Sequence, residues 1–210
     1  MYKSLALLFL ATLLLSCSTK KQLTSTTSYS DQITHHQTEY KAEFIKDERA
    51  PLNEEDLKYM HFYPADKSYN CDCTVKLTPD AKPFELSTYS GITKPFRQYG
   101  IATCDINQKE TKVHLYTSLR TIAMPGYKDY LFLPFKDVTN GEYTYGGGRY
   151  IDLKTGDIQD GKVTIDFNKC YNPWCAYSDG YNCPIPPIEN HFEMEIKAGE
   201  KMWSGKKKKG

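Results

Sequence analysis

The sequence predicts a mainly β protein of the α+β type: an antiparallel β-barrel, roll or sandwich of about seven strands behind two N-terminal helices. Aromatic residues favour strands, and the chain contains 17 Tyr and 9 Phe among its 210 residues. Apolar residues recur with a period of two from residue 69 to residue 167. Turn-forming pairs such as Asn140-Gly141 and Thr155-Gly156 separate these stretches, and short strands with tight links are typical of antiparallel barrels and sandwiches.

Two helices precede the strands. Residues 30–47 follow a helical pattern in which three apolar residues share one stripe, namely Ile33, Tyr40 and Phe44. Asn53 is a suitable N-cap for a short second helix, and the acidic residues 54–56 lie at the positive end of its dipole. Leu57 and Met60 would then face the protein interior.

Seven stretches have the pattern of strands, and a long loop follows them. The strand candidates are residues 69–77, 84–88, 96–106, 112–118, 130–135, 148–153 and 162–167. Residues 168–190 are irregular and rich in proline, cysteine and aromatic side chains. Loops of this length are usually functional or disordered, and the aromatic content argues against disorder.

Cysteines occur at alternate positions of two predicted strands. Cys71 and Cys73 fall on the apolar face of one strand, and Cys104 falls on the apolar face of another. The spacing leaves two interpretations open. Cys104 forms a disulfide with Cys71 or Cys73, or all three are small hydrophobic residues of the core.

The chain begins like an exported lipoprotein. Lys3 precedes an uncharged run of mainly Leu, Ala and Phe, which is shorter than the roughly 20 apolar residues of a membrane-spanning helix and is typical of a signal peptide. The run ends in LLSC at residues 14–17, which resembles a lipobox. We expect residues 1–16 to be removed and acylated Cys17 to attach the protein to a lipid bilayer, because two or three acyl chains anchor stably.

Composition suggests the remaining boundaries. Residues 17–31 contain too few apolar residues to pack, so we expect a flexible tether there. Residues 32–203 should form a single globular β-rich domain, and residues 204–210 a solvated basic tail. Ser18 follows Cys17 where an inner-membrane retention signal would place an aspartate. We therefore expect a cell-envelope protein, with the outer membrane favoured over the inner membrane.

The charge of the chain argues against one class of partner. The whole chain has a formal charge of +1, from 27 basic and 26 acidic residues. Without Lys3 and the four lysines at 206–209, 22 basic residues stand against the 26 acidic ones, so the body is acidic. No basic stretch is interleaved with aromatic residues, and we expect no binding to nucleic acid.

Polar and aromatic residues concentrate in a few blocks of sequence. These are residues 135–149 (FKDVTNGEYTYGGGR), 166–176 (DFNKCYNPWCA), 183–190 (CPIPPIEN) and 198–201 (AGEK). Together the blocks resemble the signature of the domain of unknown function 1684 family, over about residues 50–202. The chain departs from the pattern at Cys170, where the family usually has a small residue such as Ala. The resemblance implies a shared site geometry and no particular activity.

Six residues of these blocks are candidates for contacting a ligand: Tyr145, Arg149, Asn168, Tyr171, Asn172 and Asn190. The three glycines before Arg149 allow the backbone to approach a ligand, and the guanidinium offers a forked donor to an anion. In the alternative interpretation this segment is a turn, and Arg149 pairs internally with Asp137 or Asp166.

Carboxylates supply candidates for acid–base chemistry. Asp137, Asp166 and Glu189 would be the catalytic residues if two of them converged on one cleft, as in glycoside hydrolysis. Such residues more often cap turns or satisfy loop backbone.

The last three cysteines, Cys170, Cys175 and Cys183, allow several interpretations. A disulfide between Cys175 and Cys183 would close the long loop. Buried free thiols, a Cys175 nucleophile paired with His114 or His191, and a zinc site that also uses Cys170 are the alternatives. The spacing matches no standard zinc pattern, so we expect neither a metal nor a cofactor.

These observations predict a lipid-anchored envelope protein of unknown activity that binds or organises an envelope component, a glycan or a small anion. Aromatic residues of the long loop would stack on sugar rings or form the core beneath the loop. The alternatives are a carboxylate-based hydrolase of envelope polymers and a purely structural scaffold. Enzymatic activity stays an open question, and the residues favour a non-enzyme.

Overall fold

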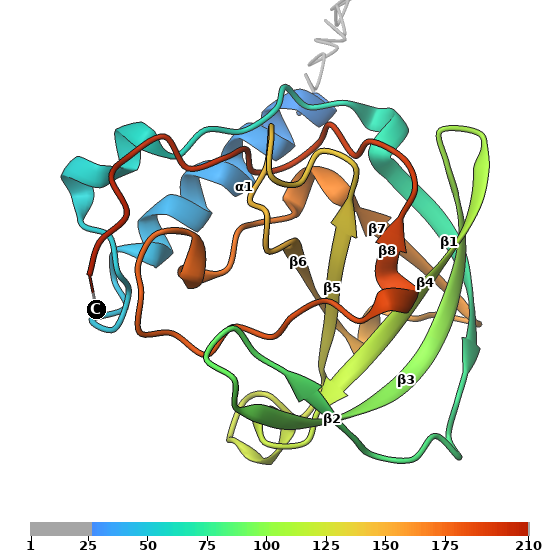
Figure 1. The fold of residues 1–210 in the computed structure, drawn as a ribbon. Coiled ribbons are helices and arrows are strands. Elements are labelled where there is room, and N and C mark those ends of the chain that lie inside the picture. The colour runs from blue at the N-terminus through green and yellow to red at the C-terminus, as the bar shows by residue number, and fades with distance from the viewer. Residues whose placement is uncertain (1–26, 210) are drawn as a thin grey trace, which may run out of the picture.

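The computed structural model describes residues 27–209, which fold around one curled sheet that forms a half-barrel (Figure 1). Its strands are β1 (Asn70–Leu77), β2 (Phe84–Ser87), β3 (Thr93–Ile106), β4 (Lys109–Ser118), β5 (Tyr130–Asp137), β6 (Arg149–Lys154), β7 (Lys162–Asp166) and β8 (His191–Phe192). The order is β6-β5-β4-β3-β1-β7, with β2 on β3 and β8 on β5. Among the named strands of residues 27–209, only the two-residue β5–β8 pairing is parallel. The predicted mainly β class is confirmed.

One α-helix and a 3₁₀ helix precede the sheet. The helix α1 (Tyr29–Phe44) begins at a capping box between Ser28 and Asp31 and buries Ile33 and Phe44. The predicted second helix is the 3₁₀ helix η1 (Glu54–Tyr59), which Asn53 caps. Six more 3₁₀ turns are η2 (Lys67–Tyr69), η3 (Thr121–Ala123), η4 (Thr155–Asp157), η5 (Phe167–Lys169), η6 (Trp174–Ala176) and η7 (Ile188–Asn190).

The strands agree with the alternation of the sequence. The longest hairpin joins β3 to β4 through Asn107 and Gln108, whose φ angles of 51° and 64° suit a tight turn between twisted strands. A bulge lies between Gln98 and Gly100. The sequence did not predict β8, because a two-residue strand has no detectable period.

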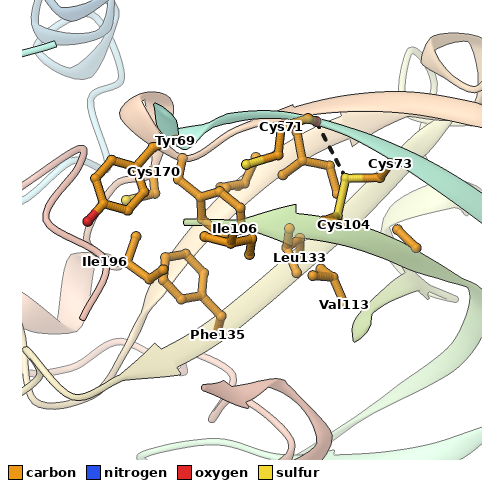
Figure 2. Packing of buried hydrophobic residues seen from close by; sticks show 14 of the residues in the cluster. Tyr69, Cys71, Cys73, Cys104, Ile106, Val113, Leu133, Phe135, Cys170 and Ile196 are labelled. Carbon is orange, nitrogen blue, oxygen red and sulfur yellow. Dashed lines mark hydrogen bonds between the residues drawn. A yellow bond between two sulfur atoms is a disulfide. The ribbon is translucent and has the colours of Figure 1, made fainter. Parts of the chain in front are cut away.

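The main core lies on the inner face of the curled sheet (Figure 2). Cys73 lies opposite Cys104 in the β1–β3 register, and the two form a disulfide. Cys71 is a buried free cysteine in the same cluster. Register therefore decides between the two bridges that the sequence left open.

A second cluster attaches α1 and η1 to the C-terminal segment. Its buried members include Phe44, Tyr177 and Trp203. The tail is bound to this region, since the N–H of Lys208 donates to the carbonyl of Tyr177 at 2.8 Å and the side chain of Lys208 pairs with Asp56. The expectation of a solvated tail is wrong for this residue, because backbone pairing at residue 208 holds the chain in place.

The predicted signal peptide, Cys17 and the tether up to residue 26 lie outside the described residues. The tether was expected to reach residue 31, and this is wrong for residues 28–31, because Ser28 caps α1 and residues 29–31 form its first turn. Among residues 27–209, no helix combines the length and the apolar character needed to span a bilayer.

Candidate functional site

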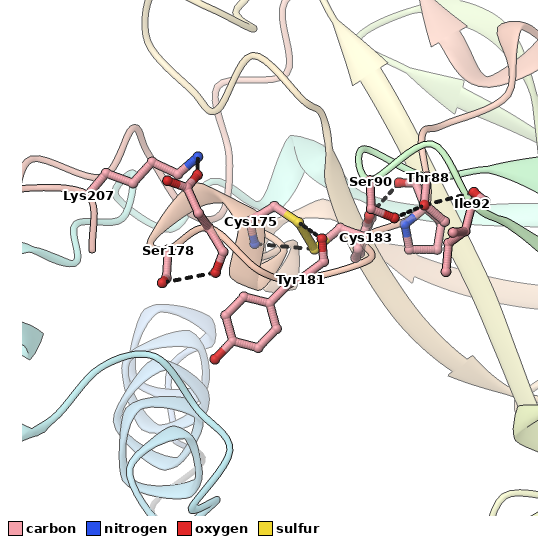
Figure 3. Close-up of a disulfide and its surroundings, with 11 residues drawn as sticks. Thr88, Ser90, Ile92, Cys175, Ser178, Tyr181, Cys183 and Lys207 are labelled. Atoms are coloured by element: carbon pink, nitrogen blue, oxygen red, sulfur yellow. Dashed lines mark hydrogen bonds and ion pairs between the residues drawn. A yellow bond between two sulfur atoms is a disulfide. The ribbon is translucent and has the colours of Figure 1, made fainter. Parts of the chain in front are cut away.

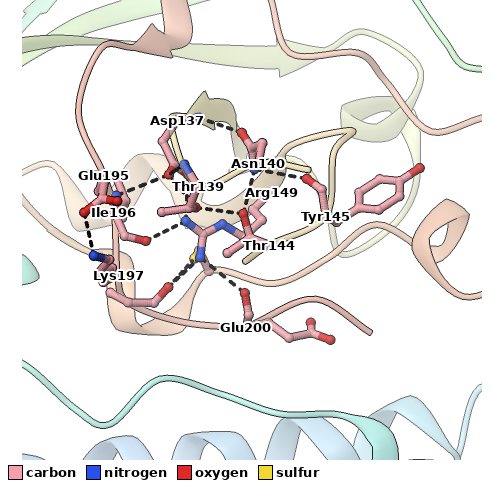
Figure 4. A network of polar contacts seen from close by, with 12 residues as sticks. Asp137, Thr139, Asn140, Thr144, Tyr145, Arg149, Glu195, Ile196, Lys197 and Glu200 are labelled. Carbon is pink, nitrogen blue, oxygen red and sulfur yellow. Dashed lines mark hydrogen bonds and ion pairs between the residues drawn. The ribbon is translucent and has the colours of Figure 1, made fainter. Parts of the chain in front are cut away.

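Arg149 lies at the centre of a buried polar network (Figure 4). Its side chain is 0% exposed, and its Nη2 donates to Asp137 Oδ2 at 2.7 Å and to the carbonyl of Ile196 at 2.8 Å. Its Nη1 donates to the carbonyls of Ala198 at 2.6 Å and Glu200 at 3.2 Å. The guanidinium thus joins the start of β6 to the end of β5 and to residues 196–200, and its two terminal nitrogens have no donor left for an external anion.

The carboxylate of Asp137 is equally occupied. Its Oδ1 accepts from the N–H of Thr139 at 2.8 Å, from the Thr139 hydroxyl at 2.5 Å and from the N–H of Ile196 at 3.2 Å. The same hydroxyl contacts Thr144 at 2.8 Å. Both oxygens of Asp137 therefore serve the fold, and because its side chain is 0% exposed, neither oxygen is presented to a substrate.

Glu200 is a second buried carboxylate and has no ion-pair partner within residues 27–209. Its Oε1 accepts from the Tyr177 hydroxyl at 2.6 Å, and its Oε2 accepts from the N–H of Asn172 at 2.8 Å. Burial raises the pKa of Glu200 to about 7 even though these two donors oppose the shift. The side chain of Asn172 donates to the carbonyl of Lys201 at 2.8 Å, so this asparagine also holds backbone.

Two other asparagines act in the same way. Asn190 accepts from the N–H of His114 at 2.8 Å and donates to the carbonyls of His114 and Pro134 at 2.9 and 2.8 Å. Asn168 accepts from the N–H of Asp66 at 2.9 Å and donates to its carbonyl at 2.8 Å. Each amide replaces a backbone pairing that an irregular segment lacks, which is how loop polar groups are kept satisfied.

Cys175 and Cys183 are joined by a disulfide across eight residues (Figure 3). Cys170 is a buried free thiol whose pKa burial raises to about 11, so it is not an activated nucleophile. Gly199 lies directly against it with a φ of +68°, and a Cβ there would lie 2.6 Å from the carbonyl oxygen of Cys170. Within residues 27–209, no three His, Cys, Asp or Glu side chains are grouped to hold a metal ion.

The structure thus brings the four sequence blocks together, mainly as interior scaffold. Arg149, Asp137, Asn168, Asn172 and Asn190 are buried. Two other candidates lie elsewhere: Tyr145 is half-buried with its ring 6.3 Å from that of Tyr89, and Glu189 is exposed.

A cleft of about 840 Å³ lies where the half-barrel opens. The two edge strands, β6 and β7, form two of its walls, and α1 lies across the opening. A helix over two sheet edges covers backbone groups that would otherwise pair with another chain. Asp166 and Tyr171 are the two predicted site residues that line this cleft.

Asp152 lies on the β6 wall of the cleft. The hydroxyls of Tyr130 and Tyr171 both donate to its Oδ1 at 2.7 Å, and within the described chain its Oδ2 accepts no hydrogen bond. The side chain keeps contact with solvent, yet the surrounding walls desolvate it enough to raise the pKa of Asp152 against the effect of the two hydroxyls. This is a carboxylate positioned by two tyrosines with one oxygen available to a ligand.

Asp166 lies on the β7 wall and is 7% exposed. Its Oδ1 accepts from the Tyr29 hydroxyl at 2.9 Å and from Asn168 Nδ2 at 3.0 Å. Its Oδ2 lies 3.9 Å from Lys169 Nζ. This aspartate both anchors the first turn of α1 and contributes charge to the cleft.

Aromatic side chains complete the cleft: Tyr40, Phe44, Tyr171 and Trp174. The rings of Tyr40 and Tyr171 lie 5.7 Å apart, and those of Phe44 and Trp174 lie 6.2 Å apart. Six carboxylates also line it, namely Glu39, Glu43, Asp47, Asp152, Asp157 and Asp166. The basic residues that line the cleft are Lys169 and His36. Burial lowers the pKa of His36. The cleft is therefore acidic and aromatic, which disfavours a small anion and suits hydroxyl-rich or cationic ligands.

The sequence did not single out Asp152 or its partner Tyr130. The only local signal is an acidic residue two positions after Tyr150, on the same face of a strand. The cleft also depends on α1, whose residues follow an ordinary amphipathic pattern. No sequence motif therefore marked this site.

The fold and the converging blocks define a mainly β protein in which a half-barrel sheet is held by a buried polar network. Comparison with known sequences identifies its family. The chain belongs to the family described as protein of unknown function (DUF1684), whose model matches residues 55–201. A solved structure is also similar: the solution NMR structure of an uncharacterized protein from Haloarcula marismortui, with 29% identity and a TM-score of 0.62, covering 81% of this chain and 94% of that one. No curated protein matches the chain. The matched range begins after α1, so α1 lies outside the part that the family model describes.

Proposed function

We propose that this chain is a lipid-anchored protein of the cell envelope that binds a glycan in the cleft between α1, β6 and β7. The carrying observation is Asp152, held by two tyrosine hydroxyls with one oxygen free, among aromatic rings. Carboxylate oxygens accept hydrogen bonds from sugar hydroxyls, and aromatic rings pack against the apolar faces of sugar rings. The small-anion alternative does not suit this cleft, because carboxylates dominate its walls.

The anchor rests on the sequence alone. The LLSC segment at residues 14–17 supports acylation of Cys17, and an acyl anchor supports a ligand that belongs to the envelope. Cys17→Ser should abolish incorporation of labelled fatty acid and release the protein into buffer without detergent. If the unaltered protein carries no labelled acyl group, the anchor and the envelope location are both rejected.

The glycan is tested by calorimetric titration of the full chain in detergent with chitobiose, cellobiose and maltose. At least one disaccharide should bind, and Asp152→Asn should weaken it about tenfold or more, because a hydrogen bond to a charged group contributes about 1.5–3 kcal/mol. Asp80→Asn, at an exposed turn outside the cleft, is the matched control and should bind normally. If no disaccharide binds, or if both variants bind like the unaltered protein, the cleft is not a glycan site.

A second candidate is hydrolysis of a glycan. Asp152 and Asp166 line one open cleft, and the raised pKa of Asp152 suits a general acid. Of the residues expected to be catalytic, Asp137 is held by Arg149, and Glu189 is not part of the cleft. Incubation with chitotetraose distinguishes the two functions by mass spectrometry. New reducing ends that disappear in Asp152→Asn would establish hydrolysis, whereas an intact tetrasaccharide agrees with binding.

The scaffold alternative describes the sequence blocks rather than the cleft. Arg149 and three asparagines satisfy backbone groups in the interior. We infer that this network holds the edges of the half-barrel open in the shape that α1 covers.

A further inference from the structure

A second cavity lies beside the cleft. It has a volume of about 470 Å³, and the side chains used in the argument below are Lys94, Tyr150, Tyr171, Trp174, Tyr181 and Pro184. We call it the aromatic shelf, because four of these six residues carry aromatic rings. It is a separate cavity from the cleft, but Tyr171 and Trp174 form part of the wall of both.

The rings of the shelf are held in place before any ligand arrives. The Tyr150 hydroxyl donates to the carbonyl of Pro184 at 2.5 Å, and the Tyr181 hydroxyl donates to the carbonyl of Arg49 at 2.7 Å. The rings of Trp174 and Tyr181 meet edge to face with centroids 5.2 Å apart. Fixed rings lose little conformational entropy on binding, which favours affinity.

A covalent constraint supports this arrangement. The disulfide between Cys175 and Cys183 (Figure 3) closes a loop. Trp174 directly precedes this loop and Pro184 directly follows it. Tyr181 lies inside the closed segment. The shelf is therefore formed partly by a loop that a disulfide constrains.

The charge of the shelf differs from that of the cleft. None of the residues that line the shelf is acidic, and its one cation is the half-buried Lys94, which forms no ion pair within residues 27–209. Burial lowers the pKa of Lys94, and the nearby charge of Arg120 lowers it further. A carboxylate on the ligand would relieve both effects, because it would give the ammonium a partner of opposite charge.

We propose that the ligand is a linear acidic oligosaccharide that runs from the cleft onto the aromatic shelf and presents a carboxylate-bearing sugar to Lys94. This inference rests on the proposed glycan function of the cleft and specifies its ligand. Tyr171 and Trp174 line both cavities, so their rings offer apolar surface to consecutive sugar rings where the cleft meets the shelf. The acidic cleft takes neutral or amino sugars, and the basic shelf takes the acidic one.

The test compares three probes by calorimetric titration of the full chain in detergent. These are chitobiose, chitotetraose and a tetrasaccharide of alternating N-acetylglucosamine and N-acetylmuramic acid, whose lactyl groups carry carboxylates. The acidic tetrasaccharide should bind at least tenfold more tightly than chitobiose and more tightly than chitotetraose. Equal affinity for the two tetrasaccharides, or for the acidic tetrasaccharide and chitobiose, would overturn the inference.

Two variants separate this inference from the function on which it rests. Lys94→Met should lower affinity for the acidic tetrasaccharide to the level of chitotetraose and leave chitobiose binding unchanged, whereas Asp152→Asn should weaken every probe. Lys76→Met, at an exposed position of β1 outside both cavities, is the matched control. Chitobiose binding with no effect of Lys94→Met rejects the shelf alone. If the unaltered protein binds none of these probes and neither cellobiose nor maltose, the cleft is rejected as well. Thermal melts of each variant show that the fold is kept.

Discussion

Replacing Arg149 by alanine should severely destabilise the protein. The side chain is fully buried and pairs with Asp137, which is itself 0% exposed at its side chain. Removing one partner of a buried ion pair costs about 3–5 kcal/mol, because the remaining charge stays desolvated and unpaired. Three backbone carbonyls, those of Ile196, Ala198 and Glu200, would also lose their donor. Each such loss has its own cost, so about 3–5 kcal/mol is a lower bound for the whole change.

Thermal unfolding followed by circular dichroism measures the effect. For a chain of this size each kcal/mol shifts the midpoint by about 2–4 °C, so Arg149→Ala should melt at least about 6 °C lower, or fail to fold. Arg97→Ala, at an exposed position of β3, should stay within about 0.5 kcal/mol of the unaltered protein. An unchanged midpoint for Arg149→Ala would refute the view that the four sequence blocks meet in a structural network.

Three further outcomes follow from the same geometry. Burial raises the pKa of Glu200 from 4.5 to about 7, so its stabilising contribution is complete below pH 4.5 and is lost as the pH rises to 7. Urea unfolding should therefore show the free energy of unfolding fall by about 3 kcal/mol over this range, and Glu200→Gln should abolish the fall. Replacing Cys175 and Cys183 by alanine should cost about 2–3 kcal/mol in urea unfolding, since the loop spans eight residues, and no loss would contradict the chain-entropy argument. Gly199→Ala should lower the melting temperature sharply, because the φ of +68° and the close backbone leave no room for a Cβ. Gly156→Ala is the control and should not lower it, because the space around Gly156 is open. Equal melting temperatures for the two variants would show that the close packing at Gly199 is not maintained.

The local elements of this protein could be predicted from its sequence. Alternation located seven of the eight strands, and the capping residue Asn53 marked the start of η1. Turn residues such as Asn107 and Gln108 marked the β3–β4 hairpin. These signals are local, because each depends on residues within a few positions of one another.

The roles of the site residues could not be predicted in the same way. Beside three glycines, Arg149 suited both an anion site and an internal ion pair, and its carbonyl partners lie 47–51 residues further along the chain. Asp152 resembles an ordinary polar residue on the exposed face of a strand. Only the approach of β6, β7 and α1 places it in a cleft, and no local pattern reports on that approach.

The amino-acid sequence by itself determined the class of fold and the family membership, since these depend on composition, periodicity and short motifs. The tertiary structure alone decided which cysteine pairs with Cys104, because register sets the opposite residue. It also decided that Arg149 is interior while Asp152 is accessible. Burial and convergence arise from contacts between distant segments, and the curling of one sheet under α1 creates them here.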